Sequence, residues 1–216
     1  MRDERFEERL RMVETQVQAR GRFPEEILVA LREIPRHLFV PPEYQAQAYA
    51  DGPLPIGSGQ TISQPYIVAL MASLASPKKT DRILEIGLGS GYSAAVLSRL
   101  AARVYAIERE GSFLAPALEK FKALGIGNIE AKEGDGTLGW PEEAPFDSIV
   151  VTAGSPQIPP SLLKQLAAGG TLVIPVGDRE TQDLIQVLRK GPRQFERKSA
   201  GGVRFVPLIG QEGWPE

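Results

Sequence analysis

The stretch "RILEIGLGSGYSAAVLSRL", residues 82–100, joins an apolar run to an apolar pattern of helical spacing. The turn between them contains Gly87, Gly89 and Gly91. An apolar strand, a glycine-rich turn and a helix, in this order, are typical of a βα unit of a parallel sheet whose turn lies against a ligand. The rest of the sequence has to identify that ligand.

Strand-like and helix-like segments continue to alternate after this unit, as a doubly wound parallel sheet requires. Strands are predicted at 82–87, 103–108, 128–134, 147–153 and 171–177, and helices at 92–101, 112–124 and 160–168. Two further strand-like segments, 183–191 and 204–210, follow without a helix between them, which predicts an antiparallel hairpin at the sheet edge. The predicted fold class is therefore α/β: a doubly wound, mostly parallel, Rossmann-like sheet with an antiparallel C-terminal edge.

Residues 1–80 are predicted to form a small N-terminal helical lobe with a long loop. One helix ends at Gly21 and a second begins after Pro24, because apolar residues recur at helical spacing at Phe6, Leu10, Val13, Val17, Ile27, Leu28, Leu31 and Ile34. Segments 39–44 and 51–66 are too rich in Pro and Gly for regular structure, and a long loop of this kind is often functional. We expect 1–80, lobe and loop, to share one domain with the ligand-binding α/β core, 81–216.

Composition excludes several classes of protein. Hydrophobic residues make up 42% of the 216 residues, yet no apolar run approaches the ~20 residues that cross a bilayer. The absence of cysteine and the single histidine, His37, argue against disulfides and against a metal site. The net charge of −2 gives no overall positive field for nucleic acid. Because no secretory signal is present, we expect a cytoplasmic protein. We also expect a monomer without a membrane partner. The avoidance of cysteine favours a heat-adapted source.

The glycine spacing separates families of nucleotide-binding proteins. A dinucleotide fingerprint needs a third glycine in G-x-G-x-x-G, but that position is Tyr92, and no Gly-Lys-Ser/Thr phosphate loop is present. Glu108, at the end of the second strand, suits ribose hydroxyls or is a solvated strand end. Glu85, just before the turn, suits a ligand with positive charge and an amino group, and would repel a pyrophosphate. The glycines alone are also compatible with close packing.

This layout resembles that of the class I S-adenosylmethionine-dependent methyltransferases. "GDG", 134–136, fits the adenine-side loop of these enzymes, although Asp135 also suits a simple turn. The resemblance implies S-adenosylmethionine as cofactor and S-adenosylhomocysteine as product. It places the cofactor against residues of the turn, of the next strand end and of this loop: Glu85, Gly87, Gly89, Ser90, Gly91, Glu108, Arg109, Asp135 and Gly136.

The methyl acceptor is narrowed by what the chain lacks. Amino-methylating DNA enzymes carry an Asn/Asp-Pro-Pro-aromatic tetrad after the fourth strand, but this chain has "VTAGSP", 151–156, at that place. Methylation of cytosine C5 needs a cysteine nucleophile, and the chain has no cysteine. A hydroxyl acceptor needs a base, and His37 fits packing of the lobe better than catalysis. A carboxylate needs no base, because it is already ionised at neutral pH. The sequence therefore favours a carboxyl acceptor.

Five collinear segments, spread over roughly 8–210, are similar to the protein-L-isoaspartate O-methyltransferase family. They are "GQTISQPYIVALM" (59–71), "LEIGLGSGYSAAVL" (84–97), "GDGTLGWPEEAPFDSIVVTA" (134–153), "LAAGGTLVIPVG" (166–177) and "VRFVPLIG" (203–210). Leu88 and "AGSP", 153–156, depart from residues common in the family. The resemblance implies methylation of the free carboxyl of L-isoaspartyl and D-aspartyl residues in damaged proteins, which initiates repair.

By the same resemblance, Ser63 is the active-site serine, whose hydroxyl holds the substrate carboxylate near the methyl group. Ser63 also fits a helix N-cap, because Gln64, Pro65 and an apolar helical run follow it. The two roles are compatible, since a helix N-terminus attracts anions.

The resemblance also places Thr61 and Ile62 beside the cofactor, and Gln64, Arg204 and Val206 beside the substrate. Backbone groups near Val206 would hold the substrate main chain as an added strand does. Arg204 also fits a solvated strand residue. An RNA or small-molecule methyltransferase, or a sensor of S-adenosylmethionine without enzymatic activity, shares the cofactor half and stays open as an alternative.

Overall fold

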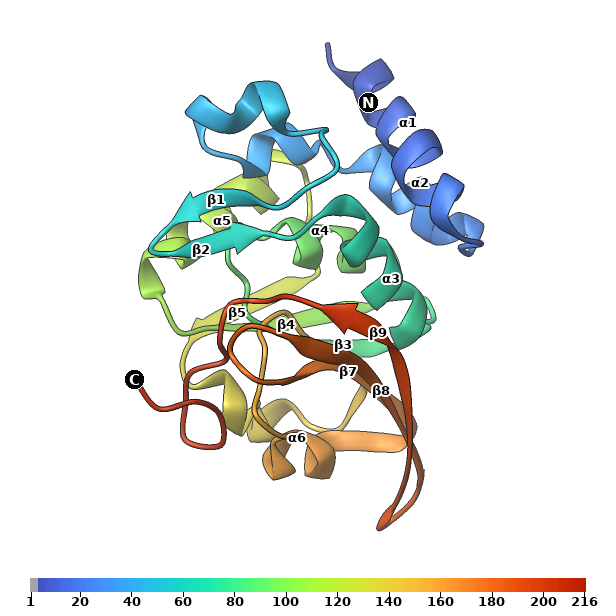
Figure 1. The fold of residues 1–216 in the computed structure, drawn as a ribbon, viewed down its shortest axis with the longest axis vertical. Helices are drawn as coiled ribbons and strands as arrows, with labels where there is room; N and C mark the ends of the chain where they lie inside the picture. Colours follow the sequence, from blue (N-terminus) through green and yellow to red (C-terminus); the bar gives the residue numbers. More distant parts are fainter. Residues whose placement is uncertain (1–3) are drawn as a thin grey trace.

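The computed structural model describes residues 4–216 and contains a seven-stranded sheet with helices on both faces (Figure 1). The strand order is β5-β4-β3-β6-β7-β8-β9. The bounds are β3 (Arg82–Ile86), β4 (Arg103–Glu108), β5 (Ile129–Glu133), β6 (Phe146–Val151), β7 (Leu166–Gly177), β8 (Gln182–Gly191) and β9 (Gln194–Val203). Strands β3 to β7 pair in parallel, whereas β8 and β9 are antiparallel. The predicted fold class is confirmed.

The strand order changes direction at β3. From β3 the chain proceeds to β4 and β5 on one side and to β6 and β7 on the other. In open α/β sheets, ligands bind outside the carboxyl ends of the strands at such a switch point. The ends of β3, β4 and β6 therefore define where a site is expected.

Two hydrophobic clusters cover the two faces of the sheet. One face carries α1 (Phe6–Met12), α2 (Glu25–Glu33), α3 (Pro65–Ala75), α4 (Tyr92–Ser98) and α5 (Leu114–Ala123), and the other carries α6 (Pro160–Gln165) (Figure 1). Ile83 of β3 packs into the first cluster and its neighbour Leu84 into the second, because successive strand side chains point to opposite faces. Val13 and Leu31 of the N-terminal lobe belong to the first cluster, so the lobe packs directly on the core.

The helices of the lobe follow the apolar spacing. A continuous helical segment, α1 followed by π and 3₁₀ turns over 13–20, stops before Gly21, and α2 begins directly after Pro24. His37 is buried, with Nδ1 2.8 Å from the Tyr49 hydroxyl, as the packing interpretation predicts. No helix among residues 4–216 is long and apolar enough to cross a membrane.

The segment 51–66 is more regular than the sequence indicated. β1 (Leu54–Gly57) and β2 (Gln60–Ile62) form an antiparallel hairpin. The two residues of its turn, Ser58 and Gly59, have φ of 47° and 68°, the left-handed pair that matches the twist of a hairpin. The prediction of irregular structure was wrong because these residues make a two-residue turn; short 3₁₀ helices at 36–39 and 42–47 also replace part of the expected loop.

The second strand of the C-terminal hairpin was also placed wrongly. It is β9, Gln194–Val203, and not 204–210. β9 is an edge strand with mostly exposed, polar side chains, so it lacks the apolar pattern by which strands are recognised. The apolar segment 204–210 instead crosses to the end of β6, where Val206 O accepts from Gly154 N at 2.7 Å and Leu208 N donates to Gly154 O at 2.8 Å.

The third predicted helix ends early. α6 stops at Gln165, not at 168, and β7 begins at Leu166 rather than at 171. Leu166 pairs with Phe146 of β6 and is fully buried. Its apolar side chain continues the helical spacing of the preceding residues, but pairing with the sheet decides its structure.

Candidate active site

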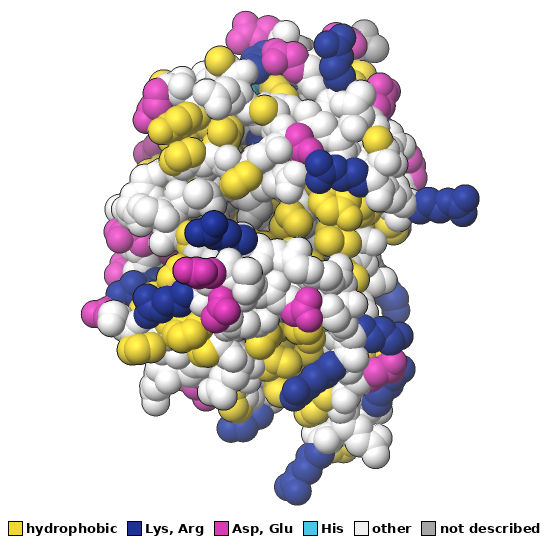
Figure 2. Space-filling model, in the orientation of Figure 1, with side chains coloured by type: hydrophobic (Ala, Val, Ile, Leu, Met, Phe, Trp, Pro, Cys, Tyr) yellow, Lys and Arg dark blue, Asp and Glu magenta, His cyan; other side chains and the backbone are white. Residues whose placement is uncertain are grey.

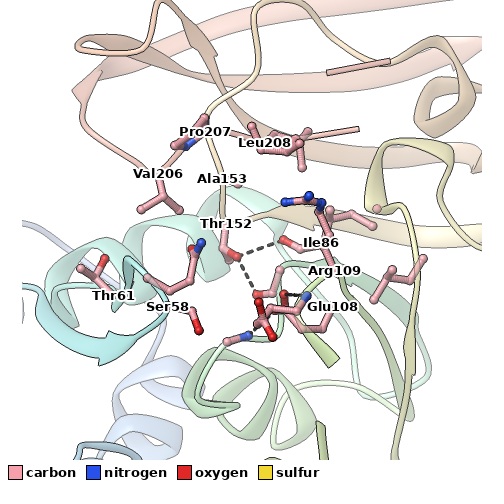
Figure 3. A pocket seen from close by; sticks show the side chains of 17 residues that line it. Ser58, Thr61, Ile86, Glu108, Arg109, Thr152, Ala153, Val206, Pro207 and Leu208 are labelled. Carbon is pink, nitrogen blue, oxygen red and sulfur yellow. Dashed lines mark hydrogen bonds between the residues drawn. The ribbon is translucent and has the colours of Figure 1, made fainter. Parts of the chain in front are cut away.

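A central cavity of about 250 Å³ lies at the switch point of the sheet (Figure 3). Its walls come from the ends of β3, β4 and β6, from the β1–β2 hairpin and from the C-terminal segment after β9. The lining residues are Ser58, Gln60, Thr61, Ile86, Gly87, Gly89, Ile107, Glu108, Arg109, Glu110, Gly136, Thr152, Ala153, Val206, Pro207, Leu208 and Ile209. The cavity thus lies where the topology predicts a ligand.

The glycine turn fits closely against the end of β6. Gly87 has φ of 93°, and a Cβ on it would lie 2.5 Å from Thr152 Oγ1. Both the backbone conformation and the lack of space therefore require glycine at this position. The turn brings bare main chain to the cavity wall, as a nucleoside that binds close to the backbone needs.

The carboxylate of Glu108 is fixed at the cavity wall by two main-chain donors. Oε2 accepts from Gly89 N at 2.7 Å, and Oε1 accepts from Glu110 N at 2.9 Å. An ionised carboxylate has about four acceptor positions, so two stay available for ligand hydroxyls. Glu108 is therefore more than a solvated strand end: it holds the glycine turn and offers acceptors to the cavity.

Two further cavities adjoin the central one. A space of about 40 Å³ lies under the glycine turn, and a groove of about 300 Å³ runs between the start of α3 and residues 202–206. We call this groove the acceptor groove. Only Thr61 and Thr152, among the lining residues, border all three spaces. A group bound in the central cavity can therefore reach the acceptor groove between these two side chains.

Ser63 borders both the small cavity and the acceptor groove. It is not the N-cap of α3: that position belongs to Gln64, whose carbonyl accepts from Val68 N at 3.1 Å. The N-cap interpretation was wrong because Pro65 is the first helical residue, which moves the cap one residue further along the chain. Within residues 4–216 the Ser63 hydroxyl has no hydrogen-bond partner, so it can donate into the groove.

The predicted site residues divide among these spaces. Those in the central cavity are Thr61, Gly87, Gly89, Glu108, Arg109, Gly136 and Val206. Ile62, Ser63 and Ser90 border the small cavity, and Ser63, Gln64, Arg204 and Val206 border the acceptor groove. Three predicted cofactor residues, Glu85, Gly91 and Asp135, border none of the three.

The carboxylate of Asp135 accepts hydrogen bonds from other residues of the protein. Oδ1 accepts from Thr137 N at 2.8 Å and from Thr137 Oγ1 at 2.6 Å, while Oδ2 accepts from Gln211 N at 2.8 Å. These bonds agree with its alternative role as a turn residue, while Asp135 also lines a further cavity that shares Arg109 and Ile209 with the central one, so its cofactor role stays a prediction. Gly91 is the N-cap of α4, where its backbone lies against Phe121 rather than against the cavity.

Glu85 is fully buried inside β3 and lines none of the three spaces, and its contact with the cofactor stays a prediction. Its side chain follows the strand alternation toward the face of α4, not toward the strand end. Burial raises the pKa of its carboxyl to about 8; the Glu108 carboxylate adds to this rise, and the nearby Ser93 hydroxyl opposes it without reaching good hydrogen-bond geometry. In the absence of ligand, the carboxyl of Glu85 is therefore mostly neutral at pH 7.

The Glu85→Gln variant tests whether Glu85 is protonated in the folded protein. The measurement is the pH dependence of stability in the absence of ligand. Between pH 4.5 and 8 the unfolded chain ionises at Glu85 while the folded protein keeps the proton, so the stability of the parent protein falls as pH rises through this window. The variant cannot ionise there. We expect its free energy of unfolding, measured by urea denaturation, to exceed the parent value by on the order of 4 kcal/mol at pH 9 but not at pH 4.

Glu119→Gln, on the exposed surface of α5, is the matched control for this measurement. It should leave the pH profile of stability as in the parent. Parallel profiles for the parent and Glu85→Gln would show that Glu85 is already ionised in the folded protein.

Two functional positions escaped sequence reasoning. Thr152 directly follows the fourth parallel strand, so its place at a strand end was available as a signal. Gln182 had no such signal: its Oε1 accepts from Phe205 N at 2.8 Å and its Nε2 donates to Asp178 O at 2.5 Å, contacts that only the folded hairpin creates. This buried amide holds the segment that forms one wall of the acceptor groove.

A seven-stranded, mostly parallel sheet with an antiparallel edge and a glycine-lined cavity at its switch point is the fold of a class I S-adenosylmethionine-dependent methyltransferase, as a similar solved methyltransferase supports. Residues 8–213 match the family model described as protein-L-isoaspartate(D-aspartate) O-methyltransferase. The chain belongs to this family.

Similar proteins of known name agree with this assignment. Protein-L-isoaspartate O-methyltransferase from Methanoregula boonei is 56% identical, over 97% of this chain and 96% of the relative. Protein-L-isoaspartate O-methyltransferase 1 from Syntrophobacter fumaroxidans is 54% identical, over 94% and 95% of the two chains. A solved protein-L-isoaspartate O-methyltransferase superposes with a TM-score of 0.84 at 30% identity, covering 96% of this chain and 67% of the other. A Plasmodium falciparum protein in complex with S-adenosyl-L-homocysteine shares the fold, with a TM-score of 0.81 at 24% identity over 93% and 98%.

Proposed function

We propose that this chain transfers a methyl group from S-adenosylmethionine to the free carboxyl of L-isoaspartyl and D-aspartyl residues in damaged proteins. One structural observation carries the proposal: the central cavity and the acceptor groove share Thr61, Thr152 and Val206, and Ser63, whose hydroxyl is unengaged in the described chain, lines the groove. The names of the relatives support the same substrate.

The residues around the central cavity fit S-adenosylmethionine. Glu108 would accept hydrogen bonds from the ribose hydroxyls, and the bare backbone at Gly87 and Gly89 allows the nucleoside to approach closely. Ile107 and Leu208 supply apolar surface in the same cavity. No pyrophosphate-binding pattern is needed for this ligand.

S-adenosylmethionine would supply a methyl group bound to positively charged sulfur. A carboxylate oxygen of the substrate would attack this methyl carbon in line with the C–S bond, so that a C–O bond forms, the C–S bond breaks and its electron pair stays on sulfur. Ser63 would donate a hydrogen bond to the carboxylate and hold it beside the junction of the cavities. Thr61 and Thr152 border the path between the reacting groups. Such alignment supplies up to roughly 7–11 kcal/mol of the barrier.

The lining of the acceptor groove agrees with a carboxylate acceptor. It contains no carboxylate and no histidine, and Arg204 is its single ionisable side chain. A hydroxyl or amine acceptor would need a base in this place, whereas a carboxylate is already ionised. Ser63 therefore serves as a positioning donor, not as a nucleophile.

The groove is also shaped for a polypeptide. Gly202 to Val206 form one wall, in which Phe205 N donates to Gln182 and Val206 O accepts from Gly154 N. A substrate backbone would pair with the remaining main-chain groups of this wall, as an added strand does. RNA binding would instead call for a broad basic surface, whereas Figure 2 shows acidic and basic side chains interspersed over the visible face.

The test compares two acceptor peptides that differ in one linkage. With radiolabelled S-adenosylmethionine, we expect a base-labile methyl ester on an L-isoaspartyl peptide and none on its normal aspartyl twin. Equal labelling of both peptides would overturn the substrate assignment, and label transferred only to RNA or to a small molecule would favour the alternative methyltransferases.

A further inference from the structure

Thr152 directly follows β6 and lines the central cavity (Figure 3), the small cavity and the acceptor groove. Its Oγ1 is 2.7 Å from the carbonyl oxygen of Gly87 and 2.9 Å from that of Ile86. Both neighbours are acceptors only. The single hydroxyl hydrogen of Thr152 is therefore directed at the glycine turn, and only oxygen lone pairs are left for a ligand.

The hydroxyls of Ser63 and Thr152, residues that both line the small cavity and the acceptor groove, therefore suit ligand groups of opposite charge. Ser63 has no partner in the described chain and can donate to a negatively charged group. Thr152 has already donated, so it cannot bind a carboxylate through its hydrogen and presents a partial negative charge. A group that benefits from Thr152 must be positively charged or carry polarised C–H bonds.

We propose, given the function proposed above, that Thr152 Oγ1 contacts the methyl-sulfonium centre of S-adenosylmethionine and favours this cation over the neutral thioether S-adenosylhomocysteine. The C–H groups beside a positive sulfur are polarised and form weak hydrogen bonds to oxygen. The contact orients the methyl group toward the acceptor groove. It also weakens when the charge disappears in the reaction, which favours release of the product.

A purely structural role for Thr152 makes a different prediction. The same hydroxyl fixes the Gly87 turn, and loss of that bond would disturb the site for both ligands alike, because they share the nucleoside and the amino acid parts. Only direct contact with the sulfonium changes the ratio of the two affinities. This ratio is the measurement that separates the two roles.

The experiment is calorimetric titration of Thr152→Val and Thr152→Ser with S-adenosylmethionine and, separately, with S-adenosylhomocysteine. Valine keeps the shape but lacks the oxygen, whereas serine keeps the oxygen. We expect Thr152→Val to reduce the preference for S-adenosylmethionine over S-adenosylhomocysteine by about fivefold relative to the parent protein. Thr152→Ser should keep the parent ratio. Both constants are measured on the same preparation, so a partly unfolded sample does not change their ratio.

An unchanged ratio in Thr152→Val, even with weaker binding of both ligands, would overturn the proposal and leave Thr152 as a support of the turn. A ratio that falls equally in Thr152→Ser would also overturn it. If the parent protein bound neither ligand, the proposed function itself would fail, which is a distinct result from an unchanged ratio.

Discussion

Replacing Ser63 with alanine is expected to lower kcat/KM for an L-isoaspartyl peptide roughly 100-fold. The hydroxyl borders the acceptor groove and is unengaged in the described chain, so its substitution leaves no other protein group unpaired. What is lost is a hydrogen bond to a charged carboxylate and the alignment that this bond provides. Affinity for S-adenosylhomocysteine, measured by calorimetry, should stay within about threefold of the parent value.

Ser73→Ala is a matched control, because Ser73 lies on α3 but borders none of the three cavities. Its kcat/KM should equal that of the parent. Full methyl transfer by Ser63→Ala would remove the positioning role of Ser63, and equal losses of cofactor binding and of activity would assign Ser63 to the cofactor instead.

Glu108→Gln is expected to weaken S-adenosylhomocysteine binding about 100-fold or more. The carboxylate accepts from Gly89 N and Glu110 N, and it has two further acceptor positions for ribose hydroxyls. The glutamine side chain has one acceptor oxygen, and its NH₂ group would face a main-chain N–H. The variant therefore loses contacts with the glycine turn and with the ligand together.

The matched control is Glu130→Gln on β5, which removes an exposed ion pair with Arg103. Pairs of this kind contribute about 0–1 kcal/mol to stability, so cofactor affinity should not change. Parent-like affinity in Glu108→Gln would show that the ribose hydroxyls bind elsewhere and that Glu108 only shapes the turn.

Local sequence patterns determined the α/β class, the parallel strands and the position of the ligand turn. Each depends on residues close together in the chain: the apolar run before Gly87, the glycines after it, and Glu108 at the next strand end. The carboxyl acceptor followed from the residues that the chain lacks. The match of five separate segments to one family then predicted Ser63 beside the substrate, and Ser63 lines the acceptor groove.

Tertiary structure decided what depends on pairing between distant segments. Edge strand β9 is defined by its partner β8 and not by its own polar sequence, and Gln182 acquires its role from Phe205 only after the hairpin forms. Only the structure shows that Glu85 is fully buried inside β3 and that the Asp135 carboxylate accepts hydrogen bonds from Thr137 and Gln211. The direction and existing partners of a side chain are properties of the packed chain, and sequence spacing specifies neither.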